Sequence, residues 1–217
     1  YSALVASNAI DFDAGVRLVR KRGELMDKAV PAGEGGMAAI IGLGEEAVAK
    51  VCAEASVAGV VEPANFNAPG QIVIAGAAAG IEKAVVLAKE AGAKRALPLA
   101  VSGPFHSSLM QKAAEEFNEA LAAIDWRAPE FAVYHNLDNQ PAPAAEIPEK
   151  LIGQLYSPVN WIGSVQALRG QADTAIEFGP GKVLAGLNKR IDKTLSTQGT
   201  GDLASLQSAI NLILGNS

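Results

Sequence analysis

The fold of this sequence is decided by residues 60–76, VVEPANFNAPGQIVIAG, which hold two stretches with the composition of β-strands. We assign these strands to residues 60–65 and 71–76, because short runs rich in Val and Ile favour extended backbone. No helical pattern lies between them. The two strands therefore form the centre of a larger pattern that continues on both sides.

The sequence on either side of this strand pair alternates between strand and helix periods. Residues 37–42 (MAAIIG) predict a strand and residues 45–56 a helix before the pair, while residues 79–92 predict a helix and residues 93–99 a strand after it. The order βαββαβ is typical of the split βαβ, ferredoxin-like arrangement. We expect a ferredoxin-like small subdomain over residues 34–99, and its simplest interpretation is a structural insertion.

The remaining sequence predicts an α/β fold around that insertion. Helices are expected at 11–26, with Asp11 as N-cap, and at 106–124, 150–155 and 161–169; strands at 131–136 and 174–178, the latter buried; and a surface loop at 138–148. Strands that alternate with helices favour a parallel sheet. We therefore assign residues 1–33 and 100–217 to one large α/β subdomain into which the small one is inserted.

Composition and charge exclude several classes of protein. With 49% hydrophobic and 19% charged residues, the 217-residue chain is neither disordered nor collagen-like. A net charge of -5 argues against a broad nucleic-acid-binding surface. The longest uncharged apolar stretch, residues 36–44, is about half of the ~20 residues that cross a bilayer, so no membrane span is predicted.

The few cysteines and histidines limit the possible metal and redox chemistry. One cysteine and two histidines cannot form an internal disulfide or an ordinary structural zinc site. Cys52 lies on the apolar face of a predicted helix, which favours core packing over catalysis. We expect no metal and a reducing compartment, the cytoplasm.

The two histidines have different settings. His135 ends a predicted strand beside Asn136, where a structural hydrogen bond is the ordinary role. His106 follows Gly103 and Pro104 at the start of a predicted helix, whose dipole would keep the imidazole neutral. A neutral histidine presented in this way could act as general base for a hydroxyl or thiol nucleophile.

One basic residue of the first long helix points inward. Projected at about 100° per residue, Arg22 falls within the apolar arc formed by Leu18, Val19, Leu25 and Met26. That face of the helix carries no carboxylate. The partner of Arg22 is therefore a buried carboxylate elsewhere in the fold or a ligand, and a substrate carboxylate matches the guanidinium fork.

Two other patterns bear on catalysis. The GPGK sequence at 179–182 lacks the Walker spacing, so a tight turn from strand to helix explains it better than phosphate binding. The pentapeptide GxSxG of a serine nucleophile elbow occurs nowhere in the 217 residues.

Several segments together resemble the malonyl-CoA:acyl-carrier-protein transacylases of fatty acid synthesis. The segments are YSALVASNAIDF (1–12), VRLVRKRGELM (16–26), MAAIIGL (37–43), NFNAPGQIVIAG (65–76), AGAKRALPLAVSGPFHSSLM (91–110), QLYSPVNW (154–161) and EFGPGKVLAGL (177–187). The segments match the family in their order along the chain as well as in their residues. The acyltransferase domains of polyketide synthases share most of them and remain the nearest alternative.

The resemblance implies an α/β-hydrolase-like large subdomain and a ping-pong reaction. A serine takes malonyl from malonyl-CoA, and the acyl-enzyme passes it to the phosphopantetheine thiol of acyl carrier protein, with no cofactor. It also implies that His106 is the general base, that the main-chain carbonyl of Gln154 holds its ring, and that Arg22 pairs with the malonyl carboxylate.

The resemblance further assigns an acyl pocket to Met26, Asn67, Val101 and Phe105. A bulky Phe just before the base accompanies preference for malonyl over methylmalonyl in this family, because it fills the space that a methyl branch needs. The implied partners are acyl carrier protein and malonyl-CoA, and we expect a monomer when the protein is complete.

The sequence departs from the family at its start. In the family, YSAL is preceded by GHSLGE, the elbow with the nucleophile serine, so we expect this chain to begin inside a larger protein and to be inactive alone. A truncated record, a split chain or a chosen boundary would each explain this. A non-catalytic carrier-protein-binding fragment and a hydrolase are the alternative functions, and Arg22 argues against the hydrolase.

Overall fold

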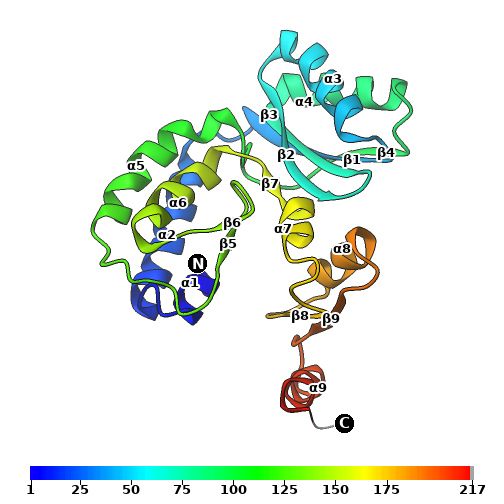
Figure 1. The fold of residues 1–217 in the computed structure, drawn as a ribbon. Coiled ribbons are helices and arrows are strands. Elements are labelled where there is room, and N and C mark those ends of the chain that lie inside the picture. The colour runs from blue at the N-terminus through cyan, green and yellow to red at the C-terminus, as the bar shows by residue number, and fades with distance from the viewer. Residues whose placement is uncertain (216–217) are drawn as a thin grey trace. The chain divides into compact units, whose positions relative to one another are not determined.

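The computed structural model describes residues 1–215, and the chain divides into two units, Tyr1–Trp161 and Ile162–Ser217. Figure 1 labels the elements. The first unit contains α1 (Ser2–Ala6), α2 (Phe12–Lys28), β1 (Gly35–Ile41), α3 (Glu45–Ala55), β2 (Val61–Ala68), β3 (Gln71–Ala77), α4 (Ala78–Glu90), β4 (Arg95–Pro98), α5 (Gln111–Ala122), β5 (Tyr134–His135), β6 (Gln140–Pro141), α6 (Ile147–Tyr156) and β7 (Val159–Asn160). The second contains β8 (Thr174–Glu177), α8 (Val183–Ile191), β9 (Ser196–Gly199) and α9 (Leu203–Leu214), and α7 (Trp161–Ala167) begins at the boundary.

The predicted βαββαβ pattern is confirmed as one sheet. Its strand order is β4-β1-β3-β2-β7, and the pairs among β1 to β4 are antiparallel, which is the ferredoxin-like order. Helices α3 and α4 lie on the same face of this sheet (Figure 1). They bury Cys52 at 3% exposure, and burial raises the pKa of its thiol to about 12, which agrees with a core role.

The edge of the sheet opposite β4 is formed by β7, which follows α6, the helix that carries Gln154. Strand β7 pairs with β2 in parallel through Asn65 with Val159 and Phe66 with Asn160. Because β7 comes three residues after the end of α6, this pairing ties the C-terminal end of α6 to the sheet.

A second core holds the helices of the first unit together. Helices α2, α5 and α6 lie side by side (Figure 1) around a cluster of buried side chains. The largest fully buried side chains of this cluster are Leu4, Ile10, Met110, Phe117, Leu121, Ile147, Leu151 and Leu155. Helix α2 extends over the predicted range, but several of its apolar side chains are exposed: Phe12 is 69% exposed, Val16 52% and Val19 50%.

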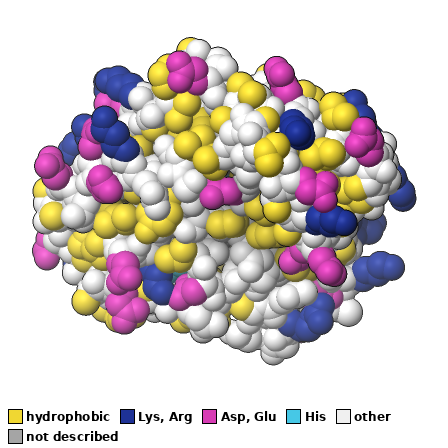
Figure 2. Space-filling model, turned by 90° about the horizontal axis from the view of Figure 1, so that it is seen from above, with side chains coloured by type: hydrophobic (Ala, Val, Ile, Leu, Met, Phe, Trp, Pro, Cys, Tyr) yellow, Lys and Arg dark blue, Asp and Glu magenta, His cyan; other side chains and the backbone are white. Residues whose placement is uncertain are grey.

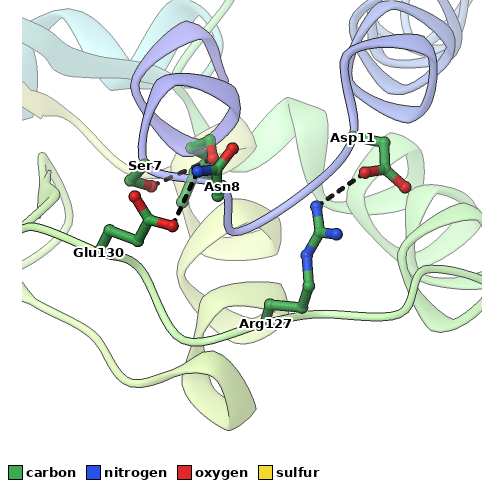
Figure 3. Close-up of polar contacts among 6 residues, drawn as sticks. Ser7, Asn8, Asp11, Arg127 and Glu130 are labelled. Carbon is green, nitrogen blue, oxygen red and sulfur yellow. Dashed lines mark hydrogen bonds and ion pairs between the residues drawn. The ribbon is translucent and has the colours of Figure 1, made fainter.

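The connection after α5 is tied to the turn between α1 and α2. Asn8 Nδ2 donates to the carboxylate of Glu130 at 2.9 Å, and the Arg127 guanidinium pairs with Asp11 at 2.8 Å (Figure 3). The Glu130 amide also donates to the Ser7 carbonyl at 2.9 Å. These contacts fix the path of a long connection that contains little regular structure.

The predicted strand at 131–136 is much shorter than expected. Only Tyr134–His135 is extended, and it pairs with Gln140–Pro141 inside the predicted surface loop. Phe131, at the start of the predicted strand, is 52% exposed and pairs with no strand of the described residues. The result is a hairpin with two residues in each strand, which precedes α6.

The second unit contains a parallel pair of strands, β8 and β9. Strand β8 matches the predicted strand at 174–178, but the expectation of burial is wrong for most of it, and Phe178 is 80% exposed. The carboxylate of Glu177 accepts hydrogen bonds from the amides of Leu184 and Ala185, each at 2.9 Å. Residues 179–182 (GPGK) connect β8 to α8, as predicted, with Gly179 and Gly181 at positive φ. The carboxylate partner of these α8 amides leaves them no role in binding phosphate.

The boundaries of the small subdomain at residues 34–99 stay a prediction.

Within residues 1–215, no helix combines the length and the hydropathy needed to cross a membrane.

Candidate active site

Two cavities in the first unit bring together residues from α2, α6 and the connection before α5. The larger, about 520 Å³, is lined by Arg22, Met26, Met37, Phe105 and His106, with Gly23, Asp27 and Ser102. The smaller, about 240 Å³, is lined by Arg22, His106 and Gln154, with Tyr1, Asn136, Ser157, Pro158 and Val159. Arg22 and His106 belong to both cavities. The candidate site therefore lies in the space that both residues line.

His106 lies in a turn before the helix rather than at its start, which corrects the predicted helix at 106–124. The 3₁₀ turn Ser108–Met110 and then α5 follow it, and His106 itself has a φ of 62°. Non-glycine residues adopt this left-handed conformation at a cost that the surroundings must offset. Such backbone strain is typical of functional sites.

Two hydrogen bonds hold this turn. Ser107 is 1% exposed, and its hydroxyl donates a hydrogen bond to the Pro104 carbonyl at 2.6 Å. The Ser108 amide donates to the Glu62 carboxylate, on β2, at 2.7 Å. A Cβ at Gly35 would lie 2.5 Å from the Pro104 ring, so glycine at the start of β1 lets this loop approach the sheet. The sheet therefore positions the turn that carries His106.

The His106 ring is held by the C-terminal end of α6. A carbonyl at position 154 of a continuing helix would accept from the amide of residue 158, but Pro158 has no N–H. The Gln154 carbonyl is thus free to accept from His106 Nδ1, at 2.8 Å. With the proton held at Nδ1, Nε2 of a neutral ring has a free lone pair that can take a proton.

The pKa of His106 is lowered from its ordinary value. Burial is the main cause, and the charge of Arg22 lowers it further, whereas the hydrogen bond to the Gln154 carbonyl acts in the opposite direction. A helix dipole was the predicted reason for a neutral ring. His106 lies outside α5, so burial and not the helix dipole is the main cause of its lowered pKa.

Arg22 points into the site as predicted. Its Nε atom is buried and has no hydrogen-bond partner among residues 1–215. A buried guanidinium N–H without a partner costs free energy unless an acceptor is supplied. The hydroxyl of Tyr1 lines the same smaller cavity and is buried; burial raises its pKa to about 12, while the neighbouring Arg22 guanidinium acts in the opposite direction.

The other predicted pocket residues lie in different places. Met26 and Phe105 line the larger cavity together with His106. Asn67 lies on β2 beside an irregularity in its pairing with β3, and Val101 lies in the connection after β4, where it is 41% exposed. The roles of all four residues stay predictions.

Sequence reasoning missed Met37 and Glu62. Met37 was placed on a strand, but nothing in MAAIIG indicates that its side chain reaches a cavity in front of His106. Glu62 gave no signal, because its contact with Ser108 joins residues 46 positions apart. His135 is 3% exposed, and its Nδ1 lies 3.2 Å from Gln154 Nε2, a structural hydrogen bond of the expected kind.

The described residues contain no group of three or more His, Cys, Asp or Glu side chains that could hold a metal ion. Figure 2 shows Lys and Arg side chains intermingled with Asp and Glu side chains on the face seen. This distribution agrees with the nearly balanced charge of the sequence.

The chain matches known proteins over most of its length. Residues 1–189 match the family described as acyl transferase domain. The chain is 50% identical over 216 residues to the malonyl CoA-acyl carrier protein transacylase of Bacillus subtilis (strain 168), covering 98% of this chain and 68% of that protein. It therefore spans about two thirds of the length of that relative.

Solved structures give the same result. A crystal structure of an acyl carrier protein S-malonyltransferase from Vibrio cholerae superposes with a TM-score of 0.94 at 52% identity, covering 96% of this chain and 69% of that one. The complex of a type II PKS acyl carrier protein with its malonyl-transacylase matches with a TM-score of 0.95 at 46% identity, covering 98% and 69%. At identities of 52% and 46%, the chain resembles these proteins in sequence as well as in fold.

Proposed function

We propose that this chain, which belongs to the acyl transferase domain family, transfers the malonyl group from malonyl-CoA to the phosphopantetheine thiol of acyl carrier protein. Its relatives carry that activity in their names. The observation that carries the residue assignment is the shared lining of Arg22 and His106, with the His106 ring fixed by the Gln154 carbonyl at 2.8 Å. A base and a carboxylate anchor face one space.

His106 acts as the base at Nε2. In the first half-reaction it takes the proton of a serine hydroxyl as the oxygen attacks the thioester carbonyl, and it returns that proton to the departing coenzyme A thiolate. In the second it takes the proton of the phosphopantetheine thiol, whose sulfur attacks the acyl-serine, and it protonates the serine oxygen that leaves. The Gln154 carbonyl stabilises the imidazolium formed in each step.

Arg22 binds the malonyl carboxylate. Its buried Nε, which has no hydrogen-bond partner in the described part of the chain, can donate together with a terminal N–H in two parallel hydrogen bonds. Met26 and Phe105 bound the space for the acyl group, and Phe105 beside the base restricts a methyl branch. We extend the pocket to Asn67 and Val101 from the family resemblance.

The nucleophile serine is not part of residues 1–217. No serine of this sequence stands on a GxSxG elbow. The buried Ser107 hydroxyl already donates to the Pro104 carbonyl, and Cys52 lies in the core of the sheet and its helices. We therefore propose that a polypeptide of these residues alone forms no acyl-enzyme. The reaction as proposed needs no cofactor, and we place it in the cytoplasm.

A polyketide-type transacylase is the second candidate. The structural match to a malonyl-transacylase in complex with a type II PKS acyl carrier protein favours it specifically. Both candidates share the malonyl donor and the carrier-protein thiol, and the carrier protein that reacts faster distinguishes them.

The test compares the variant His106→Ala with wild type in the protein that includes the nucleophile segment. Transfer of malonyl to carrier protein should fall by about 10²-fold or more, as expected for loss of a positioned base. Lys112→Ala, an exposed residue of α5, is the matched control and should keep wild-type activity. Equal rates for both variants would exclude His106 as the base.

A further inference from the structure

The hairpin of β5 and β6, with the residues 136–139 that join them, lies against α6 at two successive turns. Lys150 of α6 pairs with Asp138, and Gln154, four residues later, contacts His135 through Gln154 Nε2 and His135 Nδ1 at 3.2 Å. Residues four apart lie on one face of a helix. One face of α6 is therefore held by the hairpin.

Between these two contacts, the Leu137 side chain of the hairpin packs closely against the backbone of α6 at Gly153. A Cβ at Gly153 would lie 2.8 Å from Leu137 Cδ2, so glycine allows the end of α6 to pack against the hairpin. His135 itself is 3% exposed, and its Nε2 is buried with no partner among the described residues. A buried ring nitrogen without a partner is destabilising, and the contact with Gln154 is the one hydrogen bond that the ring makes within the described residues.

We propose that His135 is a positioning residue for the base, acting through Gln154. The side chain of Gln154 is anchored to His135, while its main-chain carbonyl accepts from His106 Nδ1 at 2.8 Å. Fixing the side chain fixes the last turn of α6, where the absent N–H of Pro158 leaves that carbonyl without a helical partner. His135 thereby keeps the carbonyl aimed at the His106 ring.

This inference rests on the proposed role of His106, and it revises what sequence alone indicated for His135. A purely structural hydrogen bond predicts that removing the ring changes stability only. A positioning role predicts a change at His106, two contacts away. The general rule is that a catalytic base is itself oriented by a further group, and here the orienting group has its own anchor.

The test uses His135→Phe, which keeps an aromatic ring but offers no acceptor, and His135→Asn, whose side-chain oxygen can accept from Gln154. The first readout is solvent exchange of the His106 Nδ1 proton, followed by NMR. We expect exchange about tenfold faster in His135→Phe, as for loss of one hydrogen bond, and near the wild-type rate in His135→Asn. The value of kcat should fall by about the same factor in His135→Phe, with KM for malonyl-CoA little changed.

A second variant covers the case in which His135→Phe does not fold. Gln154→Leu keeps the main-chain carbonyl and removes the amide, so it should match His135→Phe, and the double variant should be no worse than either single one. Trp126→Phe is the control for general loss of stability. It removes the hydrogen bond from Trp126 Nε1 to the Leu121 carbonyl, in which no residue of α6 takes part. The proposal would be overturned if the exchange rate were unchanged in both His135→Phe and Gln154→Leu. It would also be overturned if exchange in His135→Asn were as fast as in His135→Phe. Failure of the proposed function is separate, since it is seen as wild-type transfer by His106→Ala.

Discussion

Replacing Arg22 with alanine should change which acyl group the enzyme prefers. The Arg22 Nε is buried and no carboxylate among residues 1–215 satisfies it, so in the proposed complex the malonyl carboxylate is its partner. Breaking a buried ion pair costs about 3–5 kcal/mol. At about 1.4 kcal/mol per factor of ten, kcat/KM for malonyl-CoA should fall about 10²- to 10³-fold.

Acetyl-CoA has no carboxylate to lose, so its kcat/KM should stay equal or rise, because the neutral acyl group no longer faces an unpaired guanidinium. The assay measures transfer from each thioester to carrier protein. Arg22→Lys should recover only part of the malonyl activity, since an ammonium cannot reproduce the fork. Arg17→Ala, an exposed arginine on the same helix, is the matched control. A fall by the same factor for malonyl and acetyl would refute the reasoning and make Arg22 structural.

Three further predictions follow from the site. The pKa of His106 is lowered and the base must be neutral, so kcat/KM should fall with decreasing pH only below its ordinary pKa of about 6.5. Arg22→Ala should move this acid limb to higher pH with acetyl-CoA, because the Arg22 charge lowers the pKa; a shift to lower pH contradicts this. Glu62→Ala should lower kcat about tenfold by releasing the Ser108 amide, and Glu62→Gln should recover most of it; equal effects of both would exclude the hydrogen bond. A polypeptide of residues 1–217 alone should gain no mass on incubation with malonyl-CoA, and an adduct on any of its residues contradicts the proposed nucleophile.

The periodic parts of the sequence predicted the structure best. The βαββαβ order, the extent of α2 and the inward aim of Arg22 depend on local patterns of apolar residues, which the sheet and helices preserve. Resemblance located His106 and Gln154, and the structure gives their contact a physical origin in Pro158.

Long-range contacts could not be read from the sequence. The pairing of Glu62 with Ser108 and of His135 with Gln154 joins residues with no shared period or motif. The polar strand β9, STQG, has no apolar alternation, and its extended form depends on pairing with β8. The left-handed backbone of His106 is likewise imposed by its neighbours, since no propensity favours it.

In the proposed reaction His106 enters neutral, with its proton on Nδ1 and a free lone pair on Nε2. The ¹⁵N chemical shifts of its ring, recorded by NMR across a pH titration of the protein, test this directly. We expect a protonated Nδ1, an unprotonated Nε2 and a pKa below about 6.5. A ring that carries its proton on Nε2, or that remains cationic at pH 7, would contradict the assignment of His106 as the base.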